Sequence, residues 1–357
     1  MIELKTPQPA RHADPTVKAQ SLAYLIFERP NLLDVESFLT AFGLSVVSRT
    51  NDTLYLRGAA AAPFCYLVRR AEQSRFIGFG LTVEKADDLV KLSKVSGATA
   101  TRPSGMPGGG NLVTLTDPSG FKIDAIHGQI SGTPLPRRPL LQWNLAGEVV
   151  RINQGQRSPV APPEVLKLGH VVLEVADYQS TCAWYTKNFG FIPSDVQVLD
   201  DGEPAVTFMR LNLGDRPTDH HTLAIAQGFA PTYSHSAFEL LDTDAVGMGQ
   251  RVLREQGWTH SWGIGRHILG SQIFDYWEDP WGDKHEHYCD GDVCTETMQT
   301  GVHKVSREAM AQWGPVMPSS FTKPKLTLKN IFLIAKNLRS SPDLTFKKLV
   351  TLARLFG

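Results

Sequence analysis

An internal repeat constrains the fold of this chain more than any other feature of its sequence. The same pattern occurs four times: a short apolar stretch, a polar residue, an amphipathic stretch, a glycine, and then further stretches rich in β-branched and aromatic residues. The glycines that end the amphipathic stretches are Gly43, Gly97, Gly190 and Gly257. This alternation predicts an α+β fold built from four βαβββ modules.

The first module shows its helix most clearly. Val35, Phe38, Leu39 and Phe42 are spaced i, i+3, i+4 and i+7, which places them on one face of a helix. Gly43 follows at once, and glycine readily takes the left-handed conformation that ends a helix. We therefore expect an amphipathic helix that ends at this glycine.

The four modules pair into two halves with similar ends. Both "VTLTDPSGFKIDAIHG" from Val113 and "FDYWEDPWGDKHEHYCDG" from Phe274 carry a DPxG turn between strands. We expect one domain over residues 16–130 and a second over 165–295. The stretch 131–164 is rich in proline and lacks periodicity, which predicts a linker or an extended arm.

Residues 300–357 lie outside the repeat. The segments "LKNIFLIAKNLRSS" and "DLTFKKLVTLARLFG" within them have apolar and basic faces, which predicts two helices. Such an extension can close over a site or bury a subunit interface. Docking on protein is favoured over binding to a membrane surface.

Charge and composition narrow the class of partner. The 36 basic and 36 acidic residues cancel, and no block of like charge stands out, so the usual signature of a nucleic-acid binder is missing. The sequence contains no run of about 18 apolar residues, so it predicts no membrane-spanning helix. The N-terminal "MIELKTPQPARHADP" lacks the apolar core of a secretory signal. We expect a cytoplasmic homo-oligomer with a small, weakly charged ligand.

A comparison of the two halves identifies candidate metal ligands. The second half carries His170 in "LGHVVLEV", His235 in "SHSAFELL" and Glu286 in its final hairpin. The matching stretches of the first half are "LAYLIFER", "RFIGFGLTV" and "GFKIDAI", which supply Tyr24, Phe76 and Asp124. If these residues were needed for folding, both halves should carry them. Their confinement to the second half indicates a function.

Two imidazoles and one carboxylate on neighbouring strands form the ligand set typical of non-haem Fe(II), because this set leaves neighbouring coordination positions open. Alternation along the final strand puts Glu286 on one face with Lys284 and Tyr288. We expect His285 and His287 to point the other way, as second-layer or surface residues.

On these residues the stretch from Leu166 to Asp292 resembles the catalytic domain of the type I extradiol catechol dioxygenases, members of the vicinal oxygen chelate superfamily. The resemblance implies two glyoxalase- and dihydroxybiphenyl-dioxygenase-like domains, of which only the second binds metal, through His170, His235 and Glu286. It also implies that His221, in "DHHTLAIA", is the catalytic acid–base residue. His267 and Tyr276, in "GIGRHILGSQIFDY", would contact the substrate oxygens.

The resemblance implies a reaction as well. An Fe(II) enzyme, or one with Mn(II), would cleave a catechol with O₂ beside the two hydroxyls and give a ring-opened muconic semialdehyde-type product. This chain departs from many relatives at Ser234, where they have histidine, and at Ile268, Leu269 and Gly270, where they have polar residues. These differences leave the identity of the substituted catechol open.

Two alternatives are compatible with the same fold. A metal-dependent glyoxalase-like isomerase or transferase would need a further carboxylate ligand, but the corresponding stretch "AVTFMRL" offers Val206 and Phe208. A non-catalytic small-molecule-binding protein would not need His170, His235 and Glu286 together. Four tryptophans in the C-terminal part of the second half can line an aromatic pocket or pack the sheet: Trp258, Trp262, Trp277 and Trp281.

Overall fold

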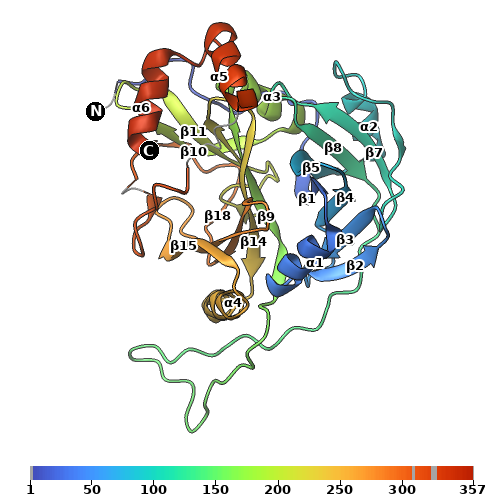
Figure 1. The fold of residues 1–357 in the computed structure, drawn as a ribbon, viewed down its shortest axis with the longest axis vertical. Helices are drawn as coiled ribbons and strands as arrows, with labels where there is room; N and C mark the ends of the chain where they lie inside the picture. Colours follow the sequence, from blue (N-terminus) through green and yellow to red (C-terminus); the bar gives the residue numbers. More distant parts are fainter. Residues whose placement is uncertain (1–2, 308–309, 323–327, 357) are drawn as a thin grey trace.

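The computed structural model describes residues 3–307, 310–322 and 328–356. Its long strands form two mixed sheets, one from each half of the repeat, and β1 of the first lies against β9 of the second (Figure 1). Each half consists of two βαβββ modules, so the predicted α+β fold of four paired modules is confirmed.

The first sheet has the strand order β2-β3-β4-β1-β5-β8-β7-β6. Its first module consists of β1 (Ala19–Arg29), α1 (Leu32–Ala41), β2 (Ser45–Arg49), β3 (Thr53–Arg57) and β4 (Tyr66–Arg70). Its second module consists of β5 (Arg75–Val83), α2 (Ala86–Leu92), β6 (Arg102–Pro103), β7 (Asn111–Thr116) and β8 (Lys122–His127). The opening strands of the two modules, β1 and β5, pair antiparallel at the centre.

The second sheet repeats this plan and extends it, with the order β15-β16-β17-β14-β9-β13-β11-β10-β19. The third module consists of β9 (Val165–Val175), α3 (Tyr178–Phe189), β10 (Ile192–Val198), β11 (Pro204–Arg210) and β13 (Leu223–Gln227). The fourth consists of β14 (Thr232–Leu240), α4 (Thr243–Glu255), β15 (Thr259–Arg266), β16 (Ile273–Glu278) and β17 (Lys284–Cys289). Outside the modules, β19 (Gly301–Lys304) adds an edge strand, and β12 (Thr218–Asp219) pairs with β18 (Val293–Cys294).

Gly43, Gly190 and Gly257 follow the ends of α1, α3 and α4 as the sequence predicts, whereas α2 ends at Leu92, before Gly97 is reached. Gly43, Gly97, Gly190 and Gly257 all have positive φ angles, of 108°, 78°, 71° and 79°. A residue with a Cβ atom is disfavoured in that conformation, whereas glycine is not. The apolar face predicted for the first helix is also buried.

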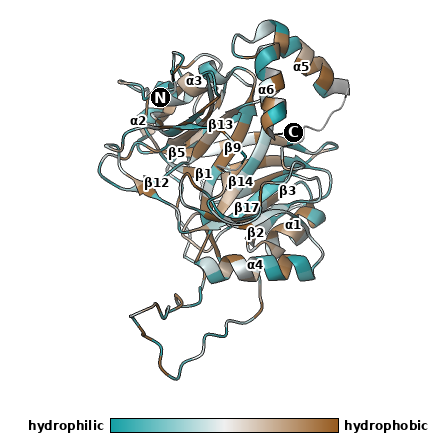
Figure 2. Ribbon diagram, turned by 90° about the vertical axis from the view of Figure 1, so that its left-hand side faces the viewer, coloured by the Kyte–Doolittle hydropathy of each residue, from teal (hydrophilic) through white to brown (hydrophobic). Residues whose placement is uncertain are grey.

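One hydrophobic core joins the two domains. Phe27 of β1 packs edge-to-face against Tyr233 of β14, with ring centroids 5.2 Å apart. Figure 2 shows hydrophobic residues along the central strand β9. Arg29 of β1 is fully buried, and its guanidinium forms ion pairs with Asp279 and Asp283 in the turn before β17. The first domain therefore supports the second from behind its central strands.

Two segments lie outside the sheets. Residues 131–164, all of which are described, project from the body as an extended arm whose one bridge joins Leu145 and Glu148 (Figures 1 and 2). After β19 come α5 (Leu328–Ser340) and α6 (Phe346–Phe356), and Leu352 of α6 is buried against Leu199 and Ala205. No helix in the described part of the chain is long and apolar enough to cross a membrane.

Candidate active site

Three adjacent strands bring His170, His235 and Glu286 together. Ala237 of β14 lies opposite His170 of β9 on one side and opposite Glu286 of β17 on the other, and His235 is two residues away on the same strand. The potential ligand atoms of the three residues all lie within 4.8 Å of one another. Glu286 Oε2 is 3.2 Å from His170 Nε2 and 3.5 Å from His235 Nε2.

The residues present fit a bound cation. Both carboxylate oxygens of Glu286 and Nδ1 of His170 are buried without a hydrogen-bond partner in the described structure, and a buried charge without compensation is costly. Two ligands about 2.1 Å from an ion and at right angles to each other lie about 3.0 Å apart, close to the separations seen here. One ion can therefore contact all three side chains after small adjustments.

The protonation states also suit metal binding. Burial lowers the pKa of His235 to about 3, so its imidazole is neutral at physiological pH. Burial alone would raise the pKa of Glu286, but its interactions with His170 and His267 lower it, so the carboxylate is ionised. Neutral imidazoles and an ionised carboxylate are the forms that bind metal ions.

Strand register allows a strict comparison with the first domain. Tyr24 and Asp124 both lie opposite Gly80, as His170 and Glu286 both lie opposite Ala237, so these two predicted equivalences are correct. The third is wrong. Gly78 lies opposite Ile26 as His235 lies opposite Val172, which makes Gly78, and not Phe76, the counterpart of His235.

The corresponding place in the first domain has neither the ligands nor the space. The Tyr24 hydroxyl donates a hydrogen bond of 3.0 Å to Asp124 Oδ2, so that carboxylate is already satisfied. A Cβ atom on Gly78 would lie 1.7 Å from the carbonyl oxygen of Lys122. The asymmetry between the halves is thus a difference in packing as well as in side-chain type.

The three predicted catalytic residues line the same cavity as His170 and His235 of the triad. The ring centroid of His221, just before β13, lies 4.0 Å from that of His170, and burial lowers the pKa of His221 well below its ordinary value. His267 Nε2 lies 3.0 Å from the Tyr276 hydroxyl, and burial raises the pKa of that phenol. His221 is therefore unprotonated at neutral pH, while Tyr276 keeps its proton.

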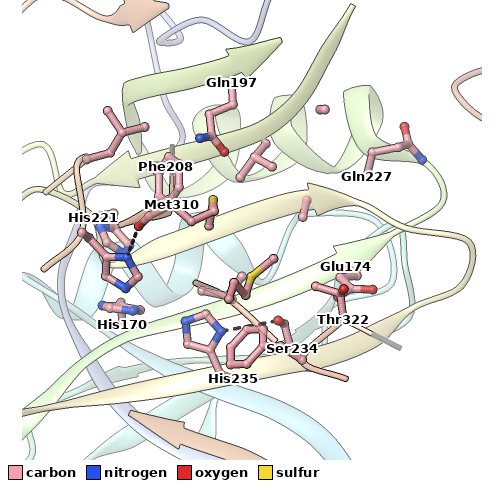
Figure 3. Close-up of a pocket in the computed structure, with 18 of the residues that line it drawn as sticks. His170, Glu174, Gln197, Phe208, His221, Gln227, Ser234, His235, Met310 and Thr322 are labelled. Atoms are coloured by element: carbon pink, nitrogen blue, oxygen red, sulfur yellow. Dashed lines mark hydrogen bonds between the residues drawn. The ribbon is translucent and has the colours of Figure 1, made fainter. Parts of the chain in front are cut away.

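The cavity has a volume of about 270 Å³ and is mainly apolar. Its hydrophobic lining consists of Val172, Ala205, Val206, Phe208, Ala226, Phe229, Leu269, Met310, Met317, Phe321 and Leu352. Figure 3 shows His170, His221 and His235 gathered at one end, with Glu174, Gln227 and Thr322 toward the other. No lysine or arginine is among the described residues that line it.

The C-terminal extension supplies part of this lining. Met310, Met317 and Phe321 lie over the cavity, and the main-chain oxygen of Met310 accepts a hydrogen bond of 2.8 Å from His267 Nδ1. The sequence predicts a lid or an interface for this segment but does not reveal these individual residues, because the segment before α5 has no periodic pattern.

The histidines that flank Glu286 are neither second-layer nor surface residues, so that prediction is wrong. Both are fully buried on the opposite face of β17, against the first domain. His285 Nε2 is 2.9 Å from the Tyr66 hydroxyl, and His287 Nε2 donates to the carbonyl oxygen of Phe42 at 2.7 Å. They belong to the interface between the domains.

The tryptophans of the second half pack the sheet and are not among the described residues that line the cavity. Trp262 stacks on Tyr276, with centroids 5.5 Å apart and an interplanar angle of 11°. Of the two interpretations, packing is therefore correct, and Trp262 holds the Tyr276 ring in place from behind.

Comparisons with known proteins show what this chain is similar to. The family model described as the Glyoxalase/Bleomycin resistance protein/Dioxygenase superfamily matches residues 167–286, which include all six predicted site residues. Metapyrocatechase 2 of Cupriavidus necator is 27% identical over 315 residues, covering 87% of this chain and 94% of that protein.

Two solved structures share the fold. Homoprotocatechuate 2,3-dioxygenase from Arthrobacter globiformis has a TM-score of 0.72 at 20% identity, covering 91% of this chain and 98% of its own. The Mn(II)-bound glyoxalase from Novosphingobium aromaticivorans has a TM-score of 0.72 at 23% identity, covering 87% and 97%. Both enzyme classes named in the sequence analysis are thus represented on this architecture.

Proposed function

Since the family model of the glyoxalase/bleomycin resistance protein/dioxygenase superfamily matches residues 167–286, we propose that this protein is an extradiol ring-cleaving dioxygenase. It would cleave a catechol beside its two hydroxyls with O₂ and place both oxygen atoms in a ring-opened semialdehyde. Its similarity over most of its length to a metapyrocatechase supports this activity. The observation that carries the proposal is the His170, His235 and Glu286 triad at the end of an apolar cavity, beside His221.

The donor set favours Fe(II), with Mn(II) as an alternative. Two imidazoles and a carboxylate on one side of an ion leave the other side open, which is the arrangement typical of non-haem iron oxygenases. When bound, such an ion supplies positive charge that lowers the pKa of a catechol hydroxyl, and it holds reactants in a fixed orientation.

The remaining residues provide proton transfer and orientation. His221 is unprotonated because burial lowers its pKa, so it can take a proton from the catechol hydroxyl and later return one to the product. Tyr276 and His267 form a hydrogen-bonded pair on the cavity wall. Burial raises the pKa of Tyr276, so its hydroxyl keeps its proton and donates it to His267 Nε2; a bound substrate oxygen would take the place of that acceptor.

The lining of the cavity favours neutral catechols with apolar ring substituents. The walls are hydrophobic, and the described lining includes no lysine or arginine that could pair with a carboxylate on the substrate. Glu174 lies in the far part, where burial raises the pKa of its carboxyl. A catechol that carries a carboxylate would therefore lose solvation there without gaining a partner.

A glyoxalase-like isomerase or transferase is the second candidate and has less support. The place of its further carboxylate ligand holds Val206 and Phe208, and the Phe208 ring packs edge-to-face against His221 at 5.1 Å. A non-catalytic binding protein would leave the buried oxygens of Glu286 unexplained.

Aerobic incubation with a panel of substituted catechols tests the proposal. We expect a yellow product with semialdehyde absorbance, stoichiometric iron or manganese in the active protein, and at least about 100-fold less activity for His235→Ala. Methyl- and phenyl-catechols should react faster than carboxylated ones. Equal behaviour with and without air, or stoichiometric nickel or zinc in the active enzyme, would contradict oxygenase chemistry.

A further inference from the structure

A chain of hydrogen bonds lies behind His221, on the side away from the cavity. Nδ1 of His221 is 3.0 Å from Nδ1 of His220, and Nε2 of His220 is 2.6 Å from Asp195 Oδ2. All three side chains are buried. The ring-cleavage roles described above use only His221, so Asp195 and His220 need a separate explanation.

Neighbouring residues hold the side chain of Asp195 on β10 in place. Its other oxygen, Oδ1, accepts a hydrogen bond of 2.8 Å from Nε2 of His303 on β19, a side chain that is 46% exposed. A Cβ atom on Gly301 would lie 2.0 Å from that same oxygen, so only glycine leaves room for it. The Ser194 hydroxyl donates to the main-chain oxygen of His220 at 2.6 Å and fixes this residue from the other side.

The chain determines which ring nitrogen carries hydrogen. Burial alone would raise the pKa of Asp195, but its hydrogen bonds with His220 and His303 lower it, so it is an ionised acceptor. Nε2 of His220 must therefore carry hydrogen. In a neutral ring the other nitrogen, Nδ1, then has a lone pair and accepts. Nδ1 of His221 must donate to it, which leaves Nε2 of His221 without hydrogen.

We propose that Asp195 and His220 are positioning residues that hold His221 in the tautomer with hydrogen on Nδ1 and a lone pair on Nε2, on the cavity side. The tautomer follows from the hydrogen bonds with Asp195 ionised and the His220 ring neutral, whereas its use as a base rests on the proposed ring cleavage. When Nε2 takes the proton of a catechol hydroxyl, the positive charge of the ring is shared with His220 and balanced by Asp195, as a carboxylate does behind other catalytic histidines.

Nitrogen-15 NMR of the histidine rings tests the assignment directly. Protein labelled with ¹⁵N-histidine and loaded with diamagnetic Zn²⁺ gives two-bond couplings that report which nitrogen is protonated, and His221→Asn identifies the signals of that ring. We expect the Nδ1–H form, which a free neutral histidine disfavours. An Nε2–H form in the unchanged protein overturns the proposal, whatever the activity.

Two variants connect the tautomer to catalysis. Asp195→Ala removes the acceptor of the His220 proton, so His221 should revert mainly to the Nε2–H form. Because a base acts on the chemical step, kcat should fall about 100-fold while KM stays within about threefold of its original value. His220→Gln should keep the Nδ1–H form and much of the activity, since its amide can donate to Asp195 and accept from His221. A tautomer unchanged in Asp195→Ala overturns the positioning role.

A matched control comes from the same domain. Nε2 of His260 bonds Asp275 Oδ1 at 2.7 Å, a comparable pair without contact to His221. His260→Ala should leave the His221 tautomer unchanged and kcat within about twofold. A fall in kcat equal to that of Asp195→Ala would assign the effect to general destabilisation and overturn the proposal. If the unchanged protein has the Nδ1–H form but cleaves no catechol, the proposed function fails and the tautomer assignment stands.

Discussion

Gly78 explains, at the scale of a single residue, why the first domain cannot build a triad. Its φ of +156° is a conformation that residues with side chains rarely adopt, and a Cβ atom would meet the Lys122 carbonyl oxygen at 1.7 Å. Gly78→Ala should lower the free energy of unfolding by about 3 kcal/mol or more, because backbone has to move. Urea denaturation measures this loss.

Gly97→Ala is the matched control for that substitution. Gly97 also has a positive φ, of +78°, but nothing lies within 4 Å of its added Cβ atom. It should cost only about 1 kcal/mol, the penalty of the backbone conformation alone. Equal losses for the two variants would show that the contact with Lys122 is not decisive.

Glu286 and Asp124 occupy equivalent positions in the two sheets, opposite Ala237 and Gly80. Glu286→Gln replaces a charged metal ligand with a neutral one and should lower both bound metal and kcat/KM by at least about 100-fold. Asp124→Asn should leave both unchanged, because this carboxylate is already bonded to Tyr24 and Thr114. Metal analysis after dialysis decides, and a metal loss shared by both variants would refute the assignment.

The site residues can be predicted from the sequence where the side-chain type differs between the two halves. Which residue of the first half is equivalent to each ligand depends on strand pairing, which the sequence does not show. The triad was identified because one half alone carries two histidines and a glutamate. Phe76 is not the counterpart of His235, because β5 and β14 align without a gap and place Phe76 with Tyr233 and Gly78 with His235. The apolar pattern of a strand does not fix such a two-residue offset.

At the scale of an element, β17 joins the candidate site to the interface between the domains. The alternation of its side chains predicted correctly that Glu286 and its flanking histidines face opposite ways. The sequence did not indicate what covers the second face. That depends on the packing of one whole sheet on another, whereas the pattern of a strand reports only which residues share a face.

The histidines of β17 predict how stability depends on pH. Burial lowers the pKa of His285 to about 4 and of His287 to about 3, whereas both are ordinary histidines in the unfolded chain. The unfolded state therefore binds more protons between about pH 6.5 and 4, so the free energy of unfolding should fall as the pH falls through this range. His285 alone accounts for about 3 kcal/mol as an upper value.

A double variant isolates this contribution. His285 Nδ1 donates to the main-chain oxygen of Asp283, so Nε2 accepts from the Tyr66 hydroxyl. His285→Phe combined with Tyr66→Phe removes the titrating ring and the hydroxyl that would lose its acceptor. Urea unfolding of metal-free protein from pH 7 to 4.5 should show a shallower decline for the variant. An identical slope would exclude His285 as a source.

At the scale of the whole molecule, the two duplicated domains have different roles. The first domain holds no triad, yet it covers the back of β17 through the shared core. The repeat allowed the number and pairing of modules to be predicted, because each module carries its own periodicity. The expected homo-oligomer stays a prediction, which light scattering can test.

The C-terminal extension completes the cavity, and this gives a prediction for substrate affinity. Phe321 packs edge-to-face on Tyr276 at 5.0 Å and lines the cavity, as does Met317. Phe321→Ala removes apolar surface that a ring substituent would contact, so KM for a phenyl-catechol should rise about tenfold while bound metal is unchanged.

Trp313 lies in the same segment with its side chain 47% exposed, and it is not among the described residues that line the cavity. Trp313→Ala should therefore leave KM within about twofold. Truncation after Thr300 should raise KM further than Phe321→Ala and still leave the metal bound, because the three candidate ligands lie on β9, β14 and β17. If KM is unchanged in the truncated protein, the extension takes no part in holding the substrate; if the metal is lost, it supports the triad itself.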